Sequence, residues 1–178
     1  MTSSGQPTPT RSEINWLLVA LVTLSTTFAD QVSKFWVLKH FQEGEVLPVI
    51  PGLFNMTLAF NPGAAFGLWS NLADGPRQVV LALTILLALT VVFVFLRQTA
   101  QRGWLPQSAL AAIMGGAVGN VIDRLTYGRV VDFLDFYWSS YHWPAFNIAD
   151  SAICVGVAVL ILLPAPKRTI TDSPNAAG

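Results

Sequence analysis

The chain has 178 residues, of which 53% are hydrophobic and only 11% are charged, and its formal net charge is zero. Soluble proteins carry about 25% charged residues, so this composition, with a mean hydropathy of +0.53, indicates a membrane protein of one domain. The lack of a basic excess argues against nucleic-acid binding. One cysteine and two histidines are too few for a disulfide or a zinc cluster.

Four apolar stretches predict membrane-spanning helices, because a span needs roughly 20 residues at 1.5 Å rise per residue. The second stretch has no polar face, which argues against the alternative of a soluble helical bundle. The stretches cover residues 14–28 (extending toward Trp36), 79–96, 105–122 and 148–163. We expect a domain at residues 14–166 between polar, disordered tails at 1–13 and 167–178.

Four spans would place both ends of the chain on the same side of the membrane. Lys34 and Arg124 stand in predicted helix-end motifs, so they are set aside when the loop charges are compared. The remaining lysines and arginines then favour the side that carries both termini as the cytoplasm.

The segment at residues 37–76, between the first two spans, predicts a small sheet. Residues 46–50 and 53–60 have the composition of short strands, and Pro51-Gly52 between them is a turn signal. We expect this sheet on the outer membrane surface, where it could hold a substrate over the helices. The alternative is a lid that only packs against the bundle.

Three aspartates, Asp123, Asp132 and Asp150, lie in or beside the apolar stretches. An ionised carboxylate at membrane depth costs several kcal/mol, so we expect some of them to have a function. Two of the three follow an asparagine by three residues, at Asn120 and Asn147. Residues three apart share one face of a helix, so each pair predicts a polar notch about one turn high.

Two acidic residues, Asp30 and Asp123, have a charged neighbour that favours a structural role. Asp30 and Lys34 are four apart at the end of the first span, in the order that favours an ion pair on a helix. Asp123 has Arg124 beside it, and a cation at hand keeps a carboxylate ionised. Both patterns suit anchoring better than proton transfer.

Asp132 stands among apolar residues, and we expect it to pair with Asp150. Two carboxylates close together in a poorly solvated site share one proton, which supplies an acid and a base at the same pH. That combination can activate water and protonate an amide leaving group. The alternative pair is Asp123 with Asp150. An aspartyl hydrolase and a proton-coupled transporter both fit this pattern.

Five motifs follow one another along the chain: DQVSK (30–34), NPGAAF (61–66), GGAVGNVIDR (115–124), VVDF (130–133) and FNIADSAI (146–153). With these motifs in this order, the chain resembles lipoprotein signal peptidase, also called signal peptidase II. The resemblance covers about residues 14–165.

The resemblance implies an aspartyl intramembrane endopeptidase of the bacterial inner membrane. Such an enzyme removes the signal peptide from a diacylglyceryl-modified prolipoprotein, cutting before the lipidated cysteine. It implies no cofactor and no metal. The expected partners are the prolipoprotein and membrane lipid, with no nucleic acid, and the expected state is a monomer.

Matched motif by motif, the resemblance makes Asp132 and Asp150 the catalytic pair. The substrate-binding positions are Asn61, Asn120, Arg124 and Asn147. The supporting positions are Asp30, Lys34, Gly63 and Asp123, the last of which would orient Arg124.

The implied fold is an all-α polytopic membrane protein. It has four transmembrane helices, an extracytoplasmic β-cradle at 37–76 and a short surface helix at about 134–143. Cys154 is expected to be a packing residue of the fourth helix.

Overall fold

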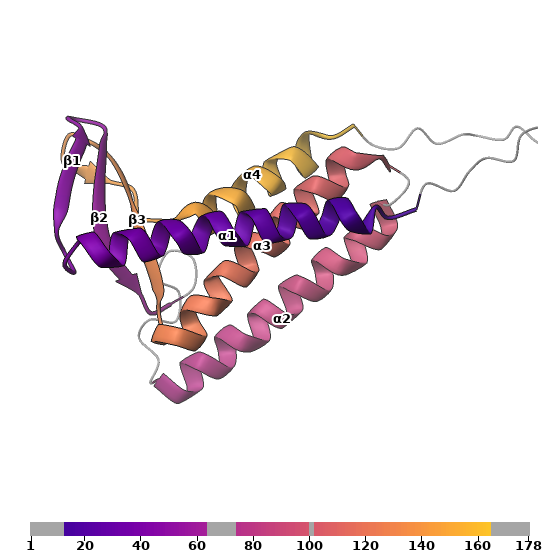
Figure 1. Cartoon of the computed structure of the whole chain (residues 1–178), viewed down its shortest axis with the longest axis horizontal. Helices are drawn as coiled ribbons and strands as arrows, with labels where there is room; N and C mark the ends of the chain where they lie inside the picture. The colour runs from indigo at the N-terminus through magenta and orange to yellow at the C-terminus, as the bar shows by residue number, and fades with distance from the viewer. Residues whose placement is uncertain (1–12, 64–73, 100–101, 165–178) are drawn as a thin grey trace, which may run out of the picture.

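The computed structural model describes residues 13–63, 74–99 and 102–164. Within these ranges the chain forms an elongated bundle of helices with a small sheet at one end (Figure 1). The helices are α1 (Trp16–His40), α2 (Asp74–Thr99), α3 (Trp104–Tyr127) and α4 (Ile148–Leu162). The strands are β1 (Val46–Ile50), β2 (Phe54–Asn61), β3 (Val130–Trp138) and β4 (Tyr141–His142). The predicted tails and part of the predicted turn after Asn61 lie outside the described residues.

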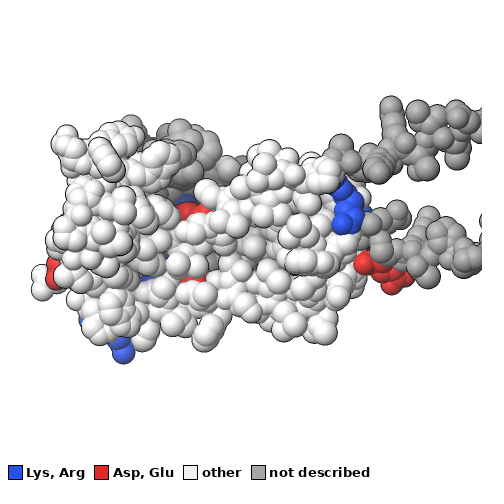
Figure 2. All heavy atoms as spheres, turned by 90° about the horizontal axis from the view of Figure 1, so that it is seen from above, with Lys and Arg blue, Asp and Glu red and all other residues white. Residues whose placement is uncertain are grey.

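Of the described helices, α1, α2 and α3 are long and apolar enough to cross a membrane. The fourth helix is also apolar but has only 15 residues, so its length alone does not make it a span. Large hydrophobic side chains on α1 and α2 face outward. On the face drawn in Figure 2 the helical surface is almost free of charged atoms, which gather at the two ends and in hollows beside the sheet.

Helix α3 lies at the centre of the bundle and packs against α1, α2 and α4. Glycines on it let the neighbours come close. A Cβ at Gly116 would lie 2.5 Å from the carbonyl oxygen of Ala149 on α4, and one at Gly119 would collide with the Asp30 carboxyl on α1. Any larger residue at these two positions would therefore push a neighbouring helix away.

The sheet has the order β1-β2-β3-β4, and all of its strand pairs are antiparallel. The two strands predicted at 46–50 and 53–60 are confirmed as β1 and β2, joined by a turn at 51–53. The sheet is larger than predicted, since β3 and β4 come from a distant part of the chain. In the β2–β3 register Ala59 stands opposite Asp132.

The short surface helix predicted at about 134–143 is wrong. These residues form the second half of β3, a turn and β4. Gly128 caps α3 in the left-handed conformation, with φ 72°, and turns the chain into the strand. Valines and aromatic residues then favour extended structure, and β2 supplies hydrogen-bonding partners as far as Phe136.

A small apolar core attaches the sheet to the end of α1. The buried side chains in it are Val37, Phe41, Leu58, Val131 and Phe133. This core holds the sheet at the end of the bundle opposite the two described ends of the chain (Figure 1).

Candidate active site

Asp132 points into the interior because side chains along β3 alternate between the two faces of the strand. Val131 and Phe133 belong to the core under the sheet, whereas Val130 and Asp132 line a cavity on the other side of the strand. Successive side chains of a strand point to opposite faces, so this register places the carboxyl in the cavity. The side chain of Asp132 is only 3% exposed.

Asp150 reaches the same cavity from the first turn of α4. Asn147 is the N-cap of that helix, and its Oδ1 accepts the backbone N–H of Asp150 at 2.9 Å. The Asp150 carboxyl in turn accepts the backbone N–H of Asn147 at 3.3 Å. The Asn-x-x-Asp spacing is here a reciprocal capping box rather than a notch on a helix face.

Two asparagine amides hold the two carboxyls. Asn147 donates from Nδ2 to Asp132 Oδ1 at 2.7 Å. Asn120, on α3, donates from Nδ2 to Asp150 Oδ1 at 2.9 Å. The amides also contact each other, with Asn147 Nδ2 lying 3.2 Å from Asn120 Oδ1. Strand β3 and helices α3 and α4 are thus joined at one point.

The cavity has a volume of about 500 Å³, and its polar end holds both aspartates together with Asn61, Asn120 and Arg124. The other walls are mostly apolar. They come from α2 (Leu81, Thr84, Ile85, Ala88), from the segment before α4 (Trp143, Pro144, Ala145, Phe146) and from the side of α4 (Ser151, Ile153, Cys154). The shape suits a molecule with one polar, extended part and a long apolar part.

Burial raises the pKa of Asp132 to about 7, and the nearby charge of Asp150 adds to the effect. Hydrogen bonds from Asn61 and Asn147 oppose the shift. One carboxyl of the pair can therefore hold a proton near neutral pH, which is the condition for general acid–base catalysis.

The ion pair predicted between Asp30 and Lys34 is confirmed, at 2.8 Å, and it is buried. Lys34 also pairs with Asp123 at 2.8 Å and donates to Asn120 at 2.9 Å. Asp30 accepts the backbone N–H of Ala149 in α4 at 2.9 Å. The cluster therefore ties α1 to the helices that carry the asparagines.

The prediction that Asp123 orients Arg124 is wrong. Asp123 accepts from Lys34, from Gln31 at 2.9 Å and from the backbone N–H of Val131 at 3.0 Å. It is fully buried in this cluster and is not among the residues that line the cavity. The alternative pair of Asp123 with Asp150 consequently has no support in the geometry.

Gln31 is a site residue that sequence reasoning missed, although it stands inside the first motif. Its amide donates to Asp123, to Asp30 at 3.3 Å and to the Gly119 carbonyl at 3.1 Å. An uncharged residue next to an acid gives no local signal of such a role. Only the packing of α1 on α3 brings these groups together.

Arg124 is held by backbone oxygens. It donates from Nη1 to the Asn120 carbonyl at 3.1 Å and from Nη2 to the Gly63 carbonyl at 2.8 Å. Its Nε is buried and has no acceptor among the residues that the structure describes. The backbone N–H of Gly63 donates to Asn61 Oδ1 at 3.0 Å, so these residues form one polar rim of the cavity.

Cys154 lies one turn after Asp150, and its side chain is exposed. The expectation of a packing residue is wrong, because α4 turns Ala149 and Gly156 toward α3 and leaves Cys154 on the cavity side.

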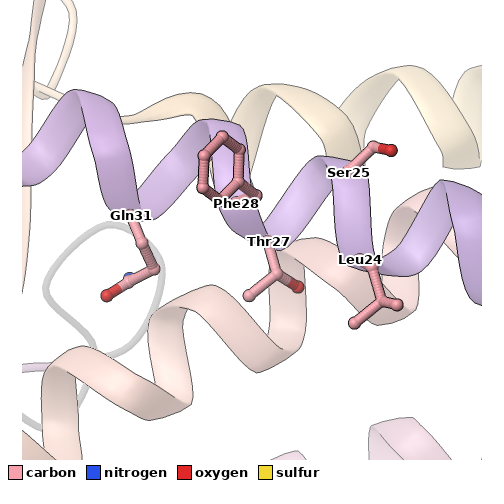
Figure 3. A pocket seen from close by; sticks show the side chains of 5 residues that line it. All are labelled: Leu24, Ser25, Thr27, Phe28 and Gln31. Atoms are coloured by element: carbon pink, nitrogen blue, oxygen red, sulfur yellow. The ribbon is translucent and has the colours of Figure 1, made fainter.

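A second hollow, of about 530 Å³, lies along α1 and has no titratable side chain in its lining (Figure 3). Thr27 and Gln31 point from it toward α3, where they bond the Gly115 and Gly119 carbonyls. All of its lining residues lie on α1, and it lacks the pair of aspartates that lines the first cavity.

Residues 22–164 match a family model described as signal peptidase (SPase) II. The chain belongs to the signal peptidase II family. A lipoprotein signal peptidase of Geobacter metallireducens is 44% identical to this signal peptidase over 148 residues, which is 83% of this chain and 90% of the relative. One of Ralstonia nicotianae is 46% identical over 147 residues, covering 83% and 82%.

Solved structures of bacterial membrane enzymes share the fold of this signal peptidase. One, determined by the in meso method at 2.3 Å, has a TM-score of 0.74 and 31% identity, covering 85% of this chain and 89% of its own. Another, determined at 1.9 Å, has a TM-score of 0.74 and 29% identity, covering 92% and 99%. The predicted family is thereby confirmed, and the alternative of a transporter has no support.

Proposed function

We propose that Asp132 and Asp150 are the catalytic pair with which this aspartic signal peptidase II removes the signal peptide of diacylglyceryl-modified prolipoproteins. One observation carries the proposal: both carboxyls face a single cavity, and each accepts an asparagine amide. Because the pKa of Asp132 is about 7, an acid and a base coexist there at neutral pH. The cut lies before the lipidated cysteine of the substrate.

The polar rim of the cavity would bind the scissile segment. An extended peptide at membrane depth has no water for its amides, so the enzyme must supply the partners. Arg124 and the amides of Asn61 and Asn120 are donors that line the polar end of the cavity. The apolar walls on α2 and α4 suit the signal helix and the acyl chains.

All four helices would cross the bacterial inner membrane, with both termini in the cytoplasm. At 1.5 Å per residue the 15 residues of α4 extend about 22 Å, which is less than the roughly 30 Å of a hydrocarbon core. Its N-cap, Asn147, is fully buried beneath the sheet. We therefore place the start of α4 inside the membrane-embedded protein, with β3 and the sheet above it toward the outer surface.

We also propose a domain at residues 14–166 that acts as a monomer. The two aspartates and the donors that hold them all come from one chain. Membrane lipid is then the remaining partner, and the mechanism calls for no cofactor.

The test is a cleavage assay with the full chain, purified in detergent or lipid. A diacylglyceryl-modified prolipoprotein should be shortened, and the unmodified precursor should not. Asp132→Asn and Asp150→Asn should each lower the rate by roughly 10² to 10⁴, since each removes an acid–base group. The control is Asp135→Asn, on the same strand, where the carboxyl bonds Asn55 and His142 instead. The proposal would be contradicted if the wild type gave no product, or if Asp132→Asn or Asp150→Asn kept full activity.

A further inference from the structure

The side-chain amide of Asn120 has only one possible orientation. The Lys34 ammonium can donate but cannot accept, so the group 2.9 Å from it must be Oδ1. The other end of the amide, Nδ2, must then donate to Asp150. By binding Oδ1 of Asn120, Lys34 on α1 orients the amide so that its Nδ2 donates to Asp150.

The ammonium group of Lys34 is held in place by its own contacts, so its hydrogen bond to Asn120 is fixed. Its three N–H groups have three acceptors at 2.8, 2.8 and 2.9 Å, in Asp30, Asp123 and Asn120. The side chain is only 2% exposed, so water does not compete. The same cluster fixes the position of α3 relative to α1.

The amide of Asn147 is oriented in the same manner. The backbone N–H of Asp150 can only donate, so it faces Oδ1 of Asn147, and Nδ2 is left for Asp132. Asp132 receives a second side-chain donor from Asn61. Asp132 thus accepts two side-chain amides, whereas Asp150 accepts one side-chain amide and the backbone N–H of the N-cap.

The surrounding charges also distinguish the two carboxyls. Asp150 stands in the first turn of α4, where the unpaired N–H groups carry partial positive charge, and it also accepts the N-cap N–H. Arg124, on α3, lines the same cavity as both carboxyls. Asp132 lies on a strand, which has little net dipole, and is almost fully buried. The attraction of Lys34 for Asp132 is the weakest influence on that group.

We infer that Asp150 is the ionised base of the pair, that Asp132 carries the shared proton, and that Lys34 is a positioning residue acting through Asn120. This assignment rests on the proposed function. Both oxygens of Asp150 accept hydrogen bonds, one from Asn120 on α3 and one from the N-cap of α4. The proton therefore lies on Asp132.

The reaction then follows from the assignment. The water oxygen bonds to the scissile carbonyl carbon, one water proton passes to Asp150, and the Asp132 proton passes to the carbonyl oxygen. In the second step the C–N bond breaks, Asp150 gives its proton to the leaving amine, and Asp132 takes the hydroxyl proton back. One water is consumed, and both carboxyls return to their starting states.

Infrared spectroscopy of the full chain tests the assignment without any turnover. A protonated carboxyl has a carbonyl stretch separate from that of a carboxylate, and the wild type should show one that disappears as the pH rises through about 7. Asp132→Asn should lose this band. Asp150→Asn should keep it, with a midpoint at lower pH, because the Asp150 charge is one cause of the raised pKa of Asp132. A band kept in Asp132→Asn, or lost in Asp150→Asn, overturns the assignment whether or not cleavage is observed.

The role of Lys34 through Asn120 is tested with Asn120→Leu, which keeps the side-chain shape and removes the relay. We expect kcat to fall at least roughly tenfold, more than KM changes. The acid limb of its pH profile should move to higher pH, because a carboxylate that has lost a donor is protonated more readily. The matched control is Asn55→Leu, which removes an equally buried amide donor from Asp135, outside the site, and should leave the profile unmoved. An unmoved acid limb in Asn120→Leu, or the same shift in both variants, refutes the relay.

Discussion

Asn147 donates a 2.7 Å hydrogen bond to Asp132 while it serves as the N-cap of the helix that carries Asp150. One side chain thus sets the distance between a strand and a helix that approach from different parts of the chain. Because Asn147 is fully buried, no water can take over either bond.

Separating the two bonds of Asn147 requires two substitutions. Asn147→Ala removes the cap and the bond to Asp132, so it should lower the free energy of unfolding by about 0.5 to 2 kcal/mol and abolish most activity. Asn147→Ser keeps a capping oxygen but is too short to reach Asp132. Thermal denaturation in detergent should show that serine restores stability, while the cleavage assay shows no recovery of rate. Recovery of both would reduce Asn147 to a helix cap.

Activity should depend on the proton that Asp132 holds. With a pKa of about 7, this carboxyl loses its proton as the pH rises past neutrality, so kcat/KM should fall on the alkaline side of about pH 7. The profile is measured with a lipidated prolipoprotein at fixed ionic strength. A rate that stays constant to pH 9 would remove Asp132 from the role of acid.

The same shift affects stability. The folded pKa of Asp132 lies above its ordinary value of 3.8, so the folded state binds this proton more tightly than the unfolded state does. Its contribution to stability is therefore present at acid pH and is lost as the pH rises from about 4 through about 7. Asp132→Asn carries no such proton, and its stability relative to the wild type should increase over that range. Unfolding followed at several pH values checks the direction.

Arg124→Lys keeps the charge and removes the planar fork. Lysine has a single nitrogen and cannot reproduce the planar geometry with which two guanidinium nitrogens bond the Gly63 and Asn120 carbonyls. We expect kcat/KM to fall roughly 10- to 100-fold, the value of one or two hydrogen bonds from a charged group, with protein levels unchanged. Near-normal cleavage would make this arginine a counter-ion alone.

Lys34→Met should destabilise the protein strongly. It leaves the carboxylates of Asp30 and Asp123 buried without their cation, at a cost of about 3 to 5 kcal/mol. Adding Asp30→Asn to the variant removes one of the uncompensated charges and should recover part of the loss. Melting temperatures in detergent check this, and a single variant as stable as the wild type would contradict the buried ion pairs.

Topology gives a further prediction. A reporter inserted after Ser140, in the sheet, should score outside the cytoplasm, and one after Gly103, between α2 and α3, should score inside. The reason is that the sheet, whose strand β3 carries Asp132, lies at the end opposite the described ends of the chain. The reverse result would put the active site on the wrong side of the membrane for an exported lipoprotein.

Local sequence pattern was sufficient for several features of this protein. An uninterrupted apolar run predicts α2, because a helix without a polar face is not stable in water. Two short runs with strand composition on either side of Pro51-Gly52 predict the β1–β2 hairpin. The i,i+4 spacing of Asp30 and Lys34 predicts their ion pair, since that contact is set by the helix itself.

Contacts between residues far apart in the chain could not be predicted from local sequence pattern. Residues 134–143 have a composition that fits a surface helix or a strand, and their hydrogen bonds to β2 decide for the strand. Asp123 has an arginine next to it in sequence, yet its cation is Lys34, on another helix. Neighbours along a helix point in different directions, whereas residues 89 positions apart meet only when α1 packs on α3. The different roles proposed for Asp132 and Asp150 have the same origin, because the helix end and the oriented amide that distinguish them are brought there by packing.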